Sequence, residues 1–166
     1  MKFLTNIDID ASFKPVGGEL PITTKKTITF AGGTTDAIGD DGGALDPFTI
    51  FTVTGLIKVS VIGICVTDLT GTNATLEVGI AGGTAILGAQ ITATALDAGE
   101  IYLGDTTPAT SFIIGEENAA ADNLPLYLLN GNDIIGTVAT ADITGGVIDF
   151  YAYWRPMSSD AELVAA

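Results

Sequence analysis

The sequence predicts an all-β protein, an antiparallel β-sandwich of eight to ten strands with a jelly-roll-like arrangement. Three observations lead to this prediction. Thr, Ile and Val make up 51 of the 166 residues, and β-branched side chains favour strands over helices. Many of the 21 glycines stand in pairs or beside Asp or Asn, which is typical of turns. Apolar and polar residues alternate in short segments about 8–12 residues apart, as in sandwiches and jelly rolls.

The expected strands follow one another without a long helix between them. In the last strand, alternation places Ile148 and Trp154 on one face, and Tyr151 and Tyr153 on the other. The sequence Asn-Gly-Asn at 130–132 predicts a hairpin between its flanking strands. A short helical turn is expected only at 116–123. The expected strands are 22–30, 48–66, 74–81, 84–96, 100–103, 110–114, 124–129, 133–138 and 146–155.

The chain is expected to hold a single domain with an extension at each end. Residues 1–21 predict an extended N-terminal arm, because their apolar residues show no clear period and prolines and glycines interrupt them. The alternative is a first strand that packs against its own sheet. We expect residues 22–157 to form the β-sandwich domain and residues 158–166 to form a C-terminal tail. We expect the arm, or the chain after Trp154, to supply contacts with other subunits.

The charge balance excludes several kinds of partner. Twenty Asp and Glu residues stand against six Lys and Arg residues, which gives a net charge of −14. Proteins that bind nucleic acids gather cations for the phosphates, and here only Lys25 and Lys26 are adjacent. An anionic membrane surface would repel the chain for the same reason. We therefore expect no nucleic-acid partner and no membrane. The absence of a long apolar stretch after Lys2 predicts synthesis in a cytoplasm without a secretory signal.

The chain has no histidine and only one cysteine. This excludes histidine-dependent catalytic triads, zinc sites built from Cys and His, and an internal disulfide. Cys65 lies in the apolar run Ile-Gly-Ile-Cys-Val, which predicts a small buried side chain and not a reactive thiol. We expect no enzymatic activity and no cofactor.

An acidic, glycine-rich loop spans residues 36–46. Calcium prefers several carboxylate and carbonyl oxygens from a flexible loop, which makes these aspartates candidate ligands. Their spacing does not match an EF-hand loop, which requires acids at alternate positions and a closing Glu. We therefore expect no metal and interpret the loop as a solvated turn, with calcium ligation as the alternative. The candidate ligands are Asp36, Asp40, Asp41 and Asp46.

An aromatic cluster stands near the end of the chain. Its alternation predicts that Phe150 and Trp154 enter the core, while the two tyrosines lie at a rim or a subunit interface with their hydroxyls in water. Stacking of the rings on a sugar is the alternative. The residues expected at an interface are Phe3, Phe13, Tyr151, Tyr153 and Arg155.

The same segment resembles a family. Residues 145–158 read Gly-Gly-Val-Ile-Asp-Phe-Tyr-Ala-Tyr-Trp-Arg-Pro-Met-Ser, and Thr144 precedes them. This is similar to the closing strand of small structural proteins of tailed bacteriophages, with the pattern T-G-G-x-I-x-[FV]-Y-x-x-W-[RK]-P-[LM]-S. The runs at 55–61 and 99–103 also fit such proteins.

The resemblance implies a capsid decoration, cement or head-spike-base protein. Such a protein is a β-sandwich, is commonly trimeric, lies on the capsid surface and has no catalytic residues. We therefore expect the major capsid protein and further copies of this chain as partners, in a homotrimer. We expect the chain in the virion after synthesis in the host cytoplasm. The alternatives are a carbohydrate- or receptor-binding module of a tail or fibre, and a tail-tube or tail-completion subunit.

Overall fold

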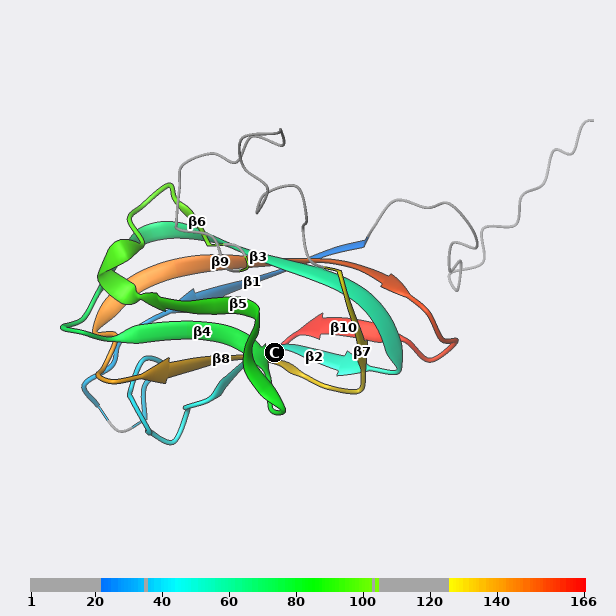
Figure 1. Ribbon diagram of the computed structural model, residues 1–166, viewed down its shortest axis with the longest axis horizontal. Helices are drawn as coiled ribbons and strands as arrows, with labels where there is room; N and C mark the ends of the chain where they lie inside the picture. Colours follow the sequence, from blue (N-terminus) through cyan, green and yellow to red (C-terminus); the bar gives the residue numbers. More distant parts are fainter. Residues whose placement is uncertain (1–21, 35, 103, 105–125) are drawn as a thin grey trace, which may run out of the picture.

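The computed structural model describes residues 22–34, 36–102, 104 and 126–166 (Figure 1). Within these residues the chain forms ten strands and one short 3-10 helix, so the all-β prediction is confirmed. The arm at 1–21, the expected strand at 110–114 and the helical turn at 116–123 lie outside the described residues. The elements are β1 (Ile22–Thr29), β2 (Phe48–Thr54), β3 (Leu56–Thr70), β4 (Thr75–Ile80), β5 (Gly83–Thr92), η1 (Ala93–Ala95), β6 (Ile101–Tyr102), β7 (Tyr127–Asn130), β8 (Ile134–Ala139), β9 (Gly145–Pro156) and β10 (Glu162–Ala165).

The strands form two antiparallel sheets that pack face to face, as the sequence predicts. The β9 sheet has the order β1-β9-β3-β6, and β7 also pairs with β3. The β8 sheet has the order β10-β2-β8-β4-β5. Figure 1 shows the two sheets as two layers, with β3 and β9 in one layer and β4, β8 and β2 in the other. The protein is therefore a β-sandwich.

The strand order also bears on the jelly-roll-like connectivity. In an eight-stranded jelly roll, the first, eighth, third and sixth strands form one sheet, and the second, seventh, fourth and fifth form the other. The observed orders match this scheme if β6 and β7, which pair with different parts of β3, occupy one position. The jelly-roll-like connectivity stays a prediction, and β10 is a further strand beside β2.

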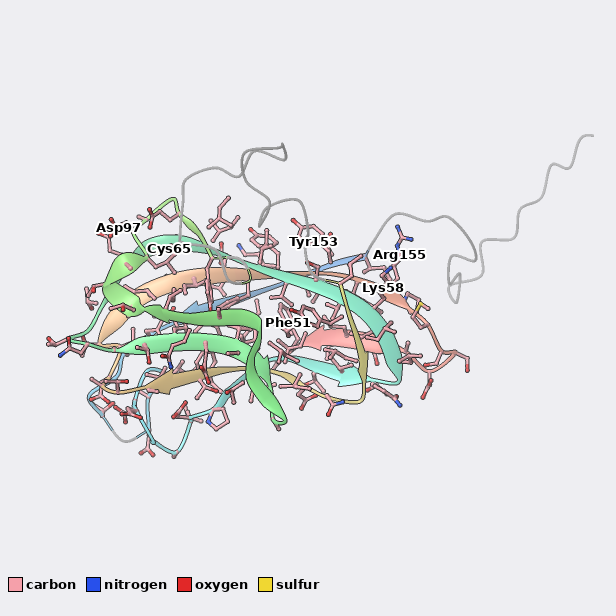
Figure 2. All side chains as sticks on the ribbon, viewed as in Figure 1. Phe51, Lys58, Cys65, Asp97, Tyr153 and Arg155 are labelled. Atoms are coloured by element: carbon pink, nitrogen blue, oxygen red, sulfur yellow. The ribbon has the colours of Figure 1, made fainter. Side chains whose placement is uncertain are left out.

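The core lies between the inner faces of the two sheets. Along β9, Ile148, Phe150, Ala152 and Trp154 are buried, as their alternation predicts. They meet apolar side chains of the opposite sheet, among which Phe51 is fully buried; Figure 2 places it between the layers. Burial of side chains of this size contributes about 1.5–3 kcal/mol each, so this interior is the main source of stability.

Two turns differ from the prediction. The expected strand at 48–66 is divided at Gly55, whose φ of 63° breaks the strand and sends β2 and β3 into different sheets. The predicted hairpin around Gly131 is wrong, because β7 pairs with β3 while β8 pairs with β2 and β4. The loop at 131–133 therefore connects the two sheets and joins no pair of neighbouring strands.

The C-terminal residues are part of the sandwich. The sequence predicts a tail at 158–166, but this segment contains β10, which pairs with β2. Leu163 is only 3% exposed and lies opposite Val53, so its burial holds the strand in place. A single buried leucine in a four-residue strand is too short a pattern to show alternation in sequence.

Hydrogen bonds connect the sheets at both edges. At one edge Lys26 of β1 donates to the carbonyl of Ala166, and Thr24 Oγ1 of the same strand donates to the carbonyl of Leu163 in β10 at 3.5 Å. At the other edge the Ala89 amide donates to the carbonyl of Gly104 at 2.6 Å. The two layers are thus joined across their rims as well as through the core.

We expect Gly136→Ala to lower the free energy of unfolding by about 1–3 kcal/mol, because the added methyl group would overlap the buried Phe48 ring. Urea denaturation measures the change. Gly82→Ala is the control, since nothing lies within 4 Å of its added methyl group. Equal unfolding midpoints for the two variants would contradict this packing of Phe48 against β8.

Candidate functional site

The aspartates of the acidic loop bind backbone amides. Asp40 is 8% exposed and accepts a hydrogen bond from the Gly33 amide at 2.6 Å. Asp46 accepts from the amides of Gly42 and Val138 at 3.1 and 3.0 Å. Carboxylates that accept backbone N–H bonds fix a loop that has no regular secondary structure. The loop is therefore ordered by its own side chains.

The acidic loop also pairs with the segment before β9. The Gly32 amide donates to the carbonyl of Ile143 at 2.9 Å, and the Ile143 amide donates to the carbonyl of Gly39 at 2.8 Å. The Asp41 amide donates to the carboxylate of Asp142 at 2.9 Å, whereas Asp36 is exposed. In the described part of the chain, no three acidic, Cys or His side chains gather in a way that could hold a metal. The arrangement gives Asp40 and Asp46 a structural role, and calcium ligation stays an untested alternative.

We expect Asp46→Ala to lower the free energy of unfolding by about 1–3 kcal/mol, because it removes the acceptor of two backbone amides. Thermal or urea denaturation measures the loss. Asp36→Ala, in the same loop but exposed, should change stability little. A loss of similar size in both variants would point to net charge as the cause and against the two hydrogen bonds.

Cys65 is buried, as its apolar run predicts. Its thiol lies 3.2 Å from the carbonyl oxygen of Thr67. Burial raises the pKa of this thiol to about 11, and the charge of Asp68 adds to the shift. A thiol with this pKa is almost entirely protonated near neutral pH, so Cys65 is a poor nucleophile.

We expect Cys65 to react slowly with DTNB at pH 8 in the folded protein, because only about one thiol in a thousand is ionised at a pKa near 11. The rate in denaturant should be at least a hundredfold higher. The pKa of Cys65 is higher in the folded protein than in the unfolded chain. The contribution of this thiol to the free energy of unfolding is therefore fully present below pH 9 and is lost as the pH rises toward 11. Equal rates for folded and unfolded protein would contradict the burial of the thiol.

The predicted interface residues of β9 lie together on the outer face of their sheet. Tyr151, Tyr153 and Arg155 alternate with the buried residues of the same strand. Arg155 lies opposite Lys58 of β3, and Tyr151 lies opposite Lys25 of β1. Figure 2 shows Tyr153, Arg155 and Lys58 toward one end of the molecule, away from Cys65. We call these five residues the basic–aromatic surface.

One ion pair lies at the border of the basic–aromatic surface. Lys25 Nζ lies 2.7 Å from Asp149 Oδ2 and 5.5 Å from the centre of the Tyr151 ring. Hydrogen bonds from Lys25 and Thr27 lower the pKa of Asp149. The ammonium group also faces the ring in a cation–π geometry. These contacts hold Lys25 and Tyr151 in fixed relative positions.

The remaining cations of this face have no acidic partner among the described residues. The sequence has six Lys and Arg residues, and four of them are described. Lys26 points to Ala166 at the sheet edge, and the other three belong to the basic–aromatic surface. The described acids form no ion pair with Lys58 or Arg155. Among the described residues, this face of a protein with net charge −14 therefore carries two cations that no acidic side chain neutralises.

Apolar side chains border the same surface. Leu128 lies opposite Lys58 in the pairing of β3 with β7 and is 64% exposed. Leu126 and Met157 are also more than half exposed, at 58% and 55%. Exposed apolar groups beside aromatic rings and an arginine are typical of protein interfaces. The surface is suited to a partner that offers both carboxylates and apolar groups.

Sequence reasoning identified the β9 residues of this surface and missed the others. Period-two alternation in 146–155 was sufficient to place Tyr151, Tyr153 and Arg155. Lys58 and Leu128 become neighbours of Arg155 only through pairing across long stretches of chain. No local signal in the sequence marks that register. Phe3 and Phe13, the other interface candidates, lie outside the described residues.

No protein-family model, curated protein or solved structure matches the chain. A search of the described residues finds no helix with the length and apolar character needed to cross a membrane. The basic–aromatic surface and the resemblance of residues 145–158 are therefore the two features that bear on function.

Proposed function

We propose that the protein is a non-enzymatic structural protein of a phage virion that decorates or cements the capsid, or holds a fibre on it. The basic–aromatic surface is the observation that supports this most, because it combines exposed apolar groups with cations on a strongly acidic protein. The segment that resembles phage structural proteins, 145–158, includes all of β9. β9 supplies Tyr151, Tyr153 and Arg155 to that surface.

The proposed mechanism is the burial of area between subunits. An acidic exterior keeps free copies soluble and apart, and a face with positive charge offers a direction for attachment. The proposed partners are the major capsid protein and further copies of this chain, which form a homotrimer on the capsid surface. A modest gain in binding at each contact multiplies over the many equivalent positions of a capsid.

A binding module for carbohydrate is the second candidate, because Tyr151 and Tyr153 present two rings on one face. The two functions differ in what the surface meets. A protein partner, either the capsid protein or a further copy of this chain, requires the cations as well as the rings, whereas a sugar site depends on the rings and on polar groups around them. A glycan-binding screen of the folded protein distinguishes the two.

We expect the native protein to sediment with particles of megadalton size from its source lysate. K58Q/R155Q should reduce the number of copies per particle at least about tenfold, because it removes the two cations of the surface that have no ion-pair partner among the described residues. T72E/T94E is the matched control, since both sites are exposed and the net charge also falls by two. Thermal denaturation verifies that each variant is folded.

Native protein that stays at the top of the gradient as a small free species would overturn the proposal. Equal copy numbers for K58Q/R155Q and the control would show that the basic–aromatic surface does not contribute to binding the particle. The association of the protein with particles would not be contradicted.

A further inference from the structure

We infer that the basic–aromatic surface of one copy binds residues 3–13 from the N-terminal arm of a neighbouring copy. This deepens the proposed function and rests on it for the choice of a neighbouring copy as the source of the arm. The inference names the contact that would hold the copies together. It depends on three features of the molecule: where the arm joins the sheet, what the arm contains and what the surface lacks.

The arm joins the sheet at the end where the unpaired cations lie. Ile22 begins β1 opposite Trp154, the residue before Arg155. Arg155 in turn lies opposite Lys58, so the arm is attached one position from this row of the sheet. The 21 residues before Ile22 span at most roughly 75 Å when extended, at about 3.3–3.6 Å per residue. That length is sufficient to reach the same surface on a neighbour.

The arm contains the groups that the surface lacks. Its sequence from residue 3 reads Phe-Leu-Thr-Asn-Ile-Asp-Ile-Asp-Ala-Ser-Phe, which interleaves five large apolar side chains with Asp8 and Asp10. The carboxylates complement Lys58 and Arg155, for which the described residues provide no ion-pair partner. An arginine can hold a carboxylate through two parallel hydrogen bonds. The apolar side chains match the exposed leucines and the tyrosine rings.

The proposed contact is directional. Each copy gives its arm to one neighbour and receives an arm from another, which is a heterologous interface. Such an interface closes into a ring when the rotation between copies divides the circle evenly. A ring of three is the simplest form that agrees with the trimer implied by the resemblance. Of the two proposed partners, the contact assigns this surface to a further copy of the chain.

Carbodiimide cross-linking of the full-length protein tests this contact directly. The reagent joins a lysine amine to a carboxylate in contact with it, without a spacer. Protein mixed from unlabelled and nitrogen-15-labelled preparations is cross-linked, digested and analysed by mass spectrometry. We expect a link from Lys58 to Asp8 or Asp10 that contains one labelled and one unlabelled peptide.

Variants test whether this contact holds the oligomer together. D8N/D10N should shift the mass measured by sedimentation equilibrium from an oligomer toward a monomer. D36N/D97N is the matched control, because it removes two exposed carboxylates and changes the net charge by the same amount. The exchange of charges in D8K/D10K combined with K58E/R155E should restore the oligomer. This rescue separates a specific contact from a general effect of charge.

Three results would overturn the inference: a monomeric native protein, links only within one copy, or links from Lys58 to Glu116 or Glu117 in place of the arm. An unchanged mass for D8N/D10N would also overturn it. These failures differ from failure of the proposed function. A monomer that still sediments with particles contradicts only the arm contact, and a cross-linked oligomer that never sediments with them contradicts only the virion role.

Discussion

The antiparallel pairing of β3 with β9 is the constraint on which the rest of the structure depends. It is the longest ladder among the described residues and runs from Ile57 opposite Pro156 to Thr70 opposite Gly145. Because side chains alternate across a strand, this one register places Phe150 and Trp154 in the core and brings Arg155 beside Lys58. A slip of one residue would bury the charged groups and expose the core. The stability of the sandwich and the composition of its outer face therefore have one origin.

The sequence predicted the strands and their faces far better than their partners. Alternation and β-branched residues located β1, β4, β8 and β9 close to their observed bounds, because these signals are local. The break at Gly55 was missed, since a single glycine in an apolar run does not reveal that the chain leaves one sheet for the other. The apparent hairpin at 130–132 failed for a related reason. A turn sequence shows that the chain reverses and does not show which strand it pairs with next.

The candidate site was predictable to the same extent. The tyrosines and Arg155 share a face by their spacing alone, and Cys65 was buried as its neighbours indicated. The position of Lys58 beside Arg155 could not be predicted, because it depends on the register of β3 with β9. In the acidic loop, composition suggested ligands for an ion, whereas the structure uses Asp40 and Asp46 as acceptors for backbone amides. Aspartate serves both purposes, and only the positions of the neighbouring N–H groups separate them.

The contact between Lys26 and Ala166 limits how the sandwich can polymerise. An exposed sheet edge is a template on which a foreign strand can add, and a chain of such additions produces fibres. Lys26 of the edge strand β1 donates to the carbonyl of Ala166, the residue after β10, so a lysine side chain links the edge strands of the two sheets at this rim. A strand arriving from another molecule would have to displace this side chain, and a lysine on an edge strand opposes such additions. Growth by sheet extension is disfavoured there, and copies of the protein are left with their faces as the surfaces through which to associate.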